Sequence, residues 1–130
     1  QGVLCVAGTA GEETREKLQL LGHLVELPED EFDAATAVMG CSPAYLALAV
    51  EAIAEAGAAD GLNPALAREL VVETAAGTAE LLRRHDPAAV RKAVASPGGS
   101  TEKGLEALER EGAREAFAAA VRASLEKMRG

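Results

Sequence analysis

The chain has 130 residues, of which 48% are hydrophobic but only 2% aromatic, and its net charge is −8. This length suits one domain or a domain with a fragment of another, and the acidic balance without a basic stripe argues against a nucleic-acid partner. The longest apolar runs are far shorter than the roughly 20 residues of a membrane span, and the first residues lack the basic start of a secretory signal. We therefore expect a cytoplasmic protein with neither a nucleic-acid nor a membrane partner.

Residues 1–28 differ in character from the rest of the chain. The run GVLCVAG predicts a strand followed by a turn, and EETREKLQLLG predicts a short amphipathic helix that ends at Gly22 as its C-cap. HLVELP predicts a second strand, which Pro28 stops. Two parallel strands alone make a poor sheet, so this β-α-β unit is expected to be the closing part of a larger α/β domain.

From residue 29 onward every segment has helical character. The acidic start of EDEFDAATAVM favours a helix because carboxylates stabilise a helix N-terminus. Residues 40–42 are expected to interrupt this helix, and a new one is expected to begin with Ser42 as its N-cap and Pro43 in its first turn.

Glycine and capping residues predict the later helix boundaries. Gly61 suits a left-handed helix end, Asn63 an N-cap and Pro64 the first position of the next helix. Asp86 is expected to cap a short helix that ends near residue 95, and Gly112 separates the last two helices.

Alanine dominates the apolar residues of the helices. The aromatic side chains are only Phe32, Tyr45 and Phe117, so leucine, valine and alanine must fill the interior. Such helices approach closely but leave a small monomer core, so we expect residues 43–85 to pack against a second copy in a symmetric dimer.

The stretch ASPGGST, residues 95–101, lies between two predicted helices and has an unusual composition for a simple connection. Pro97 ends the preceding helix, and Gly98 and Gly99 can adopt positive φ and allow a ligand to touch the backbone. Free N–H groups at a helix start bind carboxylate or phosphate. A rigid turn without a ligand is the alternative explanation.

The residues that follow these glycines affect both interpretations. Ser100 or Thr101 can cap the next helix, and their hydroxyls flank the predicted anion site. Glu102 in the first turn disfavours an anion, and Lys103 is expected to offset its charge.

The remaining candidates have simple structural explanations. The segment GCSPAY at residues 40–45 predicts a helix–helix corner, and GTAG at residues 8–11 lacks the full dinucleotide motif G-x-G-x-x-G. Cys5 and Cys41 match no disulfide framework or zinc spacing, so they are expected to be small buried residues. His23 and His85 have no neighbours at metal-ligand spacing, and no metal site is predicted.

Taken in order, these segments resemble the C-terminal half of the pyrroline-5-carboxylate reductase family. The family pattern contains a Gly-Ser/Cys-Gly-Pro-Ala-Tyr/Phe element, matched at residues 40–45, and a Ser-Pro-Gly-Gly-x-Thr loop, matched at residues 96–101. The positions that fit around the loop are Pro87, Val90, Val94, Ala95, Ser96, Gly98, Gly99, Thr101, Gly104, Leu105, Leu108 and Glu109.

The resemblance implies a mainly all-α fold: a helical dimerisation domain over residues 29–130, like the C-terminal domain of 6-phosphogluconate dehydrogenase. Residues 1–28 then look like the remnant of a Rossmann nucleotide-binding domain. It implies part of an enzyme that reduces 1-pyrroline-5-carboxylate to L-proline with NADPH or NADH. The partners implied are this substrate and a second copy of the chain, as a homodimer or a higher oligomer of dimers.

The resemblance also implies roles for the loop residues. Thr101 is implied as the catalytic residue, whose hydroxyl bonds the substrate. The implied substrate-binding residues are Ser96, Pro97, Gly98, Gly99, Ser100 and Thr101. No cofactor-binding residue and no metal ligand is implied, so we expect this chain alone to bind no cofactor and to be inactive.

Two departures from the family pattern keep alternatives open. Ser42 stands where the family usually has glycine, and Glu102 adds a negative charge beside the loop. Both suit an alternative in which the chain is a non-catalytic helical dimer used for binding or assembly. A β-hydroxyacid dehydrogenase would need a lysine in a G-x-x-x-N-x-x-K helix, and no lysine here has that context.

Overall fold

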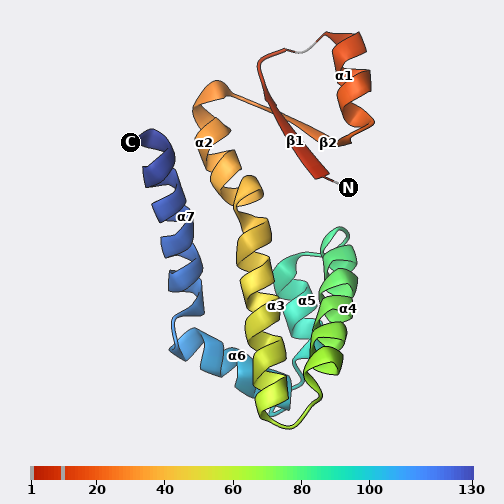
Figure 1. Ribbon diagram of the computed structural model, residues 1–130, viewed down its shortest axis with the longest axis vertical. Helices are drawn as coiled ribbons and strands as arrows, with labels where there is room; N and C mark the ends of the chain where they lie inside the picture. The colour runs from red at the N-terminus through yellow and green to blue at the C-terminus, as the bar shows by residue number, and fades with distance from the viewer. Residues whose placement is uncertain (1, 10) are drawn as a thin grey trace. The chain divides into compact units, whose positions relative to one another are not determined.

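The computed structural model describes residues 2–9 and 11–130, and most of them are helical (Figure 1). The chain divides into two compact units. One contains the residues up to Ala44 together with those from Ala118 onward, and the other contains Tyr45–Phe117. The predicted fold class, mainly helical with a short β-α-β segment before it, is confirmed.

The first unit begins with the β-α-β segment. Its elements are β1 (Gly2–Ala7), α1 (Glu12–Gln19) and β2 (Gly22–Leu27). The strands are parallel and in register along their whole length, from Gly2 opposite Gly22 to Ala7 opposite Leu27. The predicted parallel pair is therefore confirmed, although the Gly8–Gly11 turn includes one residue, Ala10, outside the described part of the chain.

The expected role of Gly22 as the C-cap of α1 is wrong. The helix ends earlier, with Leu20 still right-handed at its C-cap, and the Leu21 N–H donates to the Leu18 carbonyl at 2.9 Å. This turn frees Gly22 to pair with Gly2 as the first residue of β2. An ion pair between Arg15 and Glu26 joins α1 to this strand.

The expected interruption at residues 40–42 is confirmed in place, but it takes the form of a π-helical turn and a bend at Cys41. After a 3₁₀ turn at Glu29–Glu31, α2 (Phe32–Ala35) continues through a π-helical turn at Thr36–Gly40. It leads into the long helix α3 (Ser42–Ala59) after a single intervening residue. The backbone therefore widens into a π-helical turn here and bends at Cys41.

Hydrogen bonds explain how the helix passes this point. The Cys41 N–H donates to the Thr36 carbonyl at 3.3 Å, the five-residue spacing of a π-helix. Ser42 does not cap α3 as expected, because its hydroxyl donates back to the Val38 carbonyl one turn earlier. A small hydroxyl residue inside a helix often bonds in this way, which satisfies its side chain without ending the helix.

The continuous helical stretch over residues 29–59 has a second consequence. By length and composition alone it is apolar enough to cross a membrane, which the short apolar runs of the sequence do not suggest. One such helix is weak evidence for a membrane, because the core helix of a soluble protein meets the same criterion.

The second unit contains most of α3 and the helices that follow it. These are α4 (Pro64–Leu82), α5 (Pro87–Val94), α6 (Ser100–Arg110) and the first turns of α7 (Ala113–Arg129). Most of the predicted boundaries are confirmed. Gly61 and Gly112 have φ of 104° and 76°, and the carboxylate of Asp86 accepts the Ala88 N–H at 2.8 Å.

Asn63 provides a direct test of helix capping. Its side-chain oxygen accepts the N–H groups of Ala65 at 3.0 Å and Leu66 at 3.3 Å. We expect Asn63→Ala to lower the free energy of unfolding by about 1 kcal/mol, because these donors lose their partner. Urea unfolding at one fixed protein concentration measures this, and Asn63→Ser, which keeps an acceptor, should retain most of the stability. Equal stability of Asn63→Ala and the parent would show that the cap contributes nothing.

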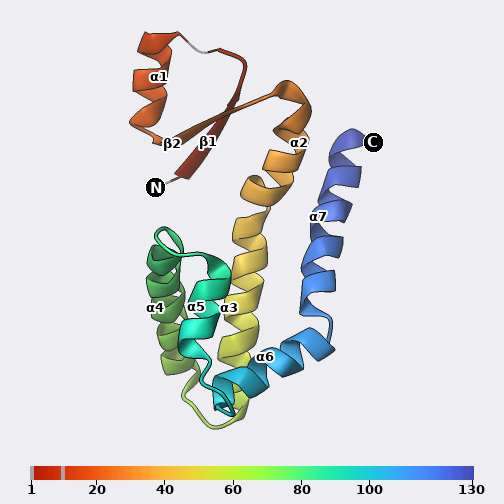
Figure 2. The same ribbon diagram turned by 180° about the vertical axis from the view of Figure 1, so that it is seen from behind.

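The core of the chain is small. Among the described residues only Ala37, Ala54 and Ala67 are buried. Within the second unit α3 and α4 lie side by side and antiparallel in both views (Figures 1 and 2). They approach closely where small residues meet, since a Cβ on Gly57 would lie 3.8 Å from the Cβ of Ala67. Most of the large apolar side chains consequently remain on the surface, as the alanine-rich composition predicts.

Candidate functional site

The loop between α5 and α6 contains the site residues predicted from the sequence. The Gly99 N–H donates to the Ser96 carbonyl at 2.9 Å, which closes a four-residue turn. Within this turn Pro97 precedes Gly98, which has φ of 73°. Proline followed by a glycine with positive φ is the order of a type II turn. The sequence therefore specifies the turn locally, and positive φ at Gly98 is confirmed.

Positive φ, one of the two reasons expected for a glycine at position 99, does not apply there. The φ of Gly99 is −80°, so it does not use the left-handed conformation. A Cβ at this position would lie only 2.9 Å from the Ser96 carbonyl oxygen, too close for an unshifted side chain. Glycine is needed here because the two backbone segments of the turn approach each other closely.

The start of α6 also differs from expectation. Gly99 is its N-cap residue, and no side chain caps the helix, so the predicted capping by Ser100 or Thr101 is wrong. The first N–H bonded within the helix is that of Lys103, which donates to the Gly99 carbonyl at 3.2 Å. Over residues 2–9 and 11–130, no acceptor is found for the N–H groups of Ser100 and Thr101. Both residues are exposed, so their N–H groups and hydroxyls are open to a ligand.

Glu102 bonds to the loop itself. Its Oε2 accepts the Gly98 N–H at 2.8 Å, so a carboxylate lies on the backbone of the predicted anion site. The sequence singles out Glu102 only as an unfavourable charge, and this hydrogen bond was not predicted. Lys103, expected to offset that charge, pairs instead with Glu106 at 2.8 Å.

Ion pairs connect the helices on either side of the loop. Arg114 Nε lies 2.7 Å from Glu109 Oε1 and 2.9 Å from Glu109 Oε2, and Arg91 lies 3.9 Å from the same carboxylate. Glu109 belongs to α6, Arg91 to α5 and Arg114 to α7. This cluster joins the last turns of α5 and α6 to the first turn of α7.

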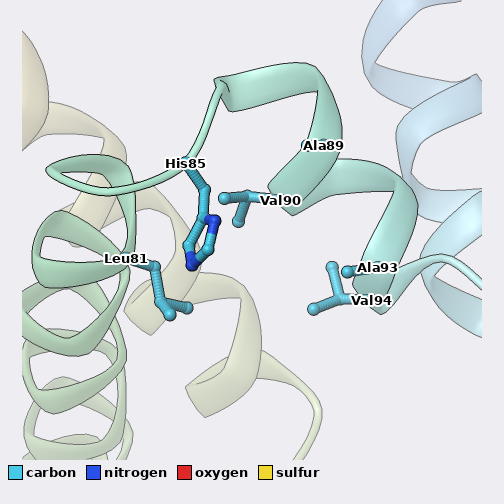
Figure 3. Close-up of a pocket in the computed structure, with 6 residues that line it drawn as sticks. All are labelled: Leu81, His85, Ala89, Val90, Ala93 and Val94. Atoms are coloured by element: carbon cyan, nitrogen blue, oxygen red, sulfur yellow. The ribbon is translucent and has the colours of Figure 1, made fainter.

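A second feature of this unit is an apolar hollow of about 320 Å³ between the end of α4 and α5 (Figure 3). The side chain of His85 points into it beside Leu81, and Val90 faces them from α5 (Figure 3). The residues that line it are Leu81, His85, Ala89, Val90, Ala93 and Val94. No polar group other than the His85 ring lies among these residues, so the hollow is suited to an apolar occupant.

The other sequence candidates lie in the first unit. Residues 40–44 comprise the last residue of the π-helical turn, Cys41 and the start of α3. Cys5 and Cys41 are both free and partly buried. His23 lies in β2. In the described part of the chain, no group of three or more potential metal ligands comes together.

The first turn of α1, which follows β1 and its glycines, is unsuited to a nucleotide. Glu12 and Glu13 occupy the first turn of α1, where the pyrophosphate of a dinucleotide would lie in a Rossmann motif. Two carboxylates at this position repel a phosphate, so the start of α1 is unsuited to a dinucleotide.

Residues 29–130 match the sequence model of a known family, described as pyrroline-5-carboxylate reductase dimerisation. The chain belongs to this family. The match includes the whole loop between α5 and α6, so the resemblance inferred from the loop and from residues 40–45 is confirmed.

Individual relatives agree with the family assignment. The pyrroline-5-carboxylate reductase of Synechocystis is 45% identical over 106 residues, covering 80% of this chain and 40% of the relative. That of Thermus thermophilus is 43% identical and covers 95% of this chain and 51% of the relative. The chain thus spans about half the length of the curated relatives it matches.

Solved structures show the same fold. The 1-pyrroline-5-carboxylate reductase of Streptococcus pyogenes superimposes with a TM-score of 0.86 at 32% identity, covering 96% of this chain and 51% of that one. The pyrroline carboxylate reductase of Plasmodium falciparum, crystallised with NADP bound, gives a TM-score of 0.82 at 30% identity. It covers 96% of this chain and 50% of that structure.

Proposed function

We propose that the chain is the dimerisation and substrate-binding part of a pyrroline-5-carboxylate reductase, which reduces 1-pyrroline-5-carboxylate to L-proline in proline biosynthesis. The observation that carries this proposal is the loop before α6, where the N–H groups of Ser100 and Thr101 have no acceptor in the described structure. Because such groups bind carboxylates, the loop suits the carboxylate shared by substrate and product. The family membership supports this reading over a non-catalytic assembly module.

The proposal assigns the loop residues to two tasks. The N–H groups of Ser100 and Thr101 hold the substrate carboxylate, because those of Gly98 and Gly99 already bond to Glu102 and Ser96. The Thr101 hydroxyl hydrogen-bonds the substrate as the catalytic group. Ser96 and Pro97 shape the turn that presents these donors, and Ser100 adds an exposed hydroxyl. The domain division proposed is residues 1–28 as part of a nucleotide-binding domain and 29–130 as the helical domain.

NADPH or NADH is proposed as the hydride donor of the complete enzyme, in line with the NADP-bound relative. No cofactor is proposed for this chain, because Glu12 and Glu13 disfavour a dinucleotide at the start of α1. A cytoplasmic location is proposed, as for a biosynthetic enzyme that acts on a small metabolite.

Self-association is the second part of the proposal. The second unit exposes a large share of its leucine side chains, for example Leu46 and Leu48 at 64% each. A monomer rarely exposes so much apolar surface, and a second copy of the chain is the partner that the dimerisation family implies. The apolar hollow beside His85 lies in the same unit (Figure 3).

Thr101→Ala tests the substrate-binding role. We expect the chain to bind L-proline with millimolar affinity and the variant to bind it about fivefold more weakly, since one hydrogen bond is worth about 1 kcal/mol. Titration with proline while backbone amide NMR shifts are followed measures the affinity and locates the site. Thr74→Ala is the control, because that hydroxyl donates to the Leu70 carbonyl within α4. Largest shifts away from residues 96–104 would contradict the proposal.

A further inference from the structure

The loop before α6 already has a carboxylate of its own. Glu102 Oε2 accepts the Gly98 N–H at 2.8 Å, and the Glu102 side chain is half-buried against the turn. Ser100 and Thr101, which lie between these two residues in the sequence, present N–H groups that no described residue accepts. The loop therefore offers donors to an incoming carboxylate in the same turn whose backbone already holds the Glu102 carboxylate.

Neighbouring basic groups do not neutralise this charge. Lys103 pairs with Glu106 at 2.8 Å, and Arg114 and Arg91 both pair with Glu109. Among the described residues no ion pair includes Glu102. A ligand at the loop consequently encounters a Glu102 carboxylate that accepts the Gly98 N–H but pairs with no described basic side chain.

This charge affects different carboxylates unequally. A simple monocarboxylate is an anion, and it is disfavoured by a like charge nearby. An amino or imino acid such as proline carries a cationic nitrogen beside its carboxylate, so its net charge is zero and the repulsion largely cancels. The difference requires no particular pose of the ligand, because it follows from net charge alone.

We propose that Glu102 is a specificity-determining residue, which selects zwitterionic amino and imino acids over simple carboxylates at the loop. This inference rests on the proposed function, in which the loop holds the substrate carboxylate. Glu102 has a second effect on the same site, since its bond to Gly98 occupies one donor that a ligand would otherwise use.

The test compares two ligands of the same shape, L-proline and cyclopentanecarboxylate, which lacks the ring nitrogen. Each is titrated into the full 130-residue chain at low salt while backbone amide NMR shifts are followed. We expect the parent to bind proline more tightly, and Glu102→Gln to strengthen binding of cyclopentanecarboxylate by about three- to tenfold. The preference for proline should thereby fall at least threefold. Added NaCl should narrow the gap between parent and variant.

Two further variants separate charge from loop structure. Glu102→Ala removes the acceptor as well as the charge, whereas the amide of Glu102→Gln can still accept the Gly98 N–H. A selectivity change in both variants supports the inference, and a change in Glu102→Ala alone would overturn it by showing that Glu102 only braces the turn. Glu115→Gln, the same charge change on α7, is the control and should leave the preference unaltered.

The outcomes also distinguish this inference from the proposed function. Binding of both ligands at residues 96–104 with an unchanged preference in Glu102→Gln would overturn the role of Glu102 and leave the substrate-binding role intact. If neither ligand shifted these amides in any variant, the substrate-binding role and the inference would both be wrong.

Discussion

Leu70→Glu should convert the chain from a dimer into a species that sediments as a monomer at micromolar concentration. Leu70 lies on α4 with half of its surface exposed, next to Leu66 at 44% on the same helix face. If this face packs against a second copy, a buried carboxylate without a partner costs several kcal/mol. We expect the dissociation constant to rise at least a hundredfold, which sedimentation equilibrium measures directly.

The controls for this prediction separate dissociation from unfolding. Circular dichroism should show that Leu70→Glu remains helical at protein concentrations high enough for it to associate. Leu20→Glu makes the same substitution at a position that is 86% exposed near the end of α1, and it should leave the dimer unchanged. A parent chain that is a stable, folded monomer at micromolar concentration would show that the exposed leucines have another role.

Local chemistry explains which parts of the fold the sequence could predict. Asn63 and Asp86 each accept an N–H two residues ahead, a contact that needs no other part of the protein. Gly61 and Gly112 take positive φ, a conformation that side chains disfavour at almost any position. Such boundaries depend on three or four adjacent residues, so they are readable from residue type and order.

The wrong boundaries depend on contacts beyond the local motif. Gly22 lies where a C-cap would fit, but pairing with Gly2 across the parallel strands determines its conformation. Ser42 has the chemistry of an N-cap, but its hydroxyl bonds back to Val38 and the helix continues through a π-helical turn. In both cases a competing hydrogen bond overrode a favourable local preference.

The candidate site likewise has features that local residues predict and features that depend on contacts across the turn. The turn at Pro97 and Gly98 follows from residue type, since that pair suits a type II turn. The reason for Gly99 could not be read from the sequence, because it depends on the position of the Ser96 carbonyl across the turn. The bond from Gly98 to Glu102 likewise depends on how α6 begins, and only the excess charge was visible beforehand.

Gly99→Val should abolish ligand binding at the loop. Its Cβ would lie 2.9 Å from the Ser96 oxygen, so the turn must open and lose the bond from Gly99 N–H to that carbonyl. The turn would then no longer hold the N–H groups of Ser100 and Thr101 in place. We expect proline affinity to fall more than tenfold and the free energy of unfolding to fall by about 1 to 3 kcal/mol. The amide NMR titration and urea unfolding measure the two effects.

Gly104→Val is the control, because it replaces a glycine by valine outside the turn. Gly104 lies in the same helix α6, and a Cβ there meets nothing within 4 Å. Because valine is a better helix former than glycine, this variant should keep both proline binding and stability. Both variants replace glycine by valine, so a loss of proline binding and stability in Gly99→Val alone is due to the close approach to Ser96. Proline binding by Gly99→Val as tight as in the parent would mean that the loop joins two helices without serving as a carboxylate site.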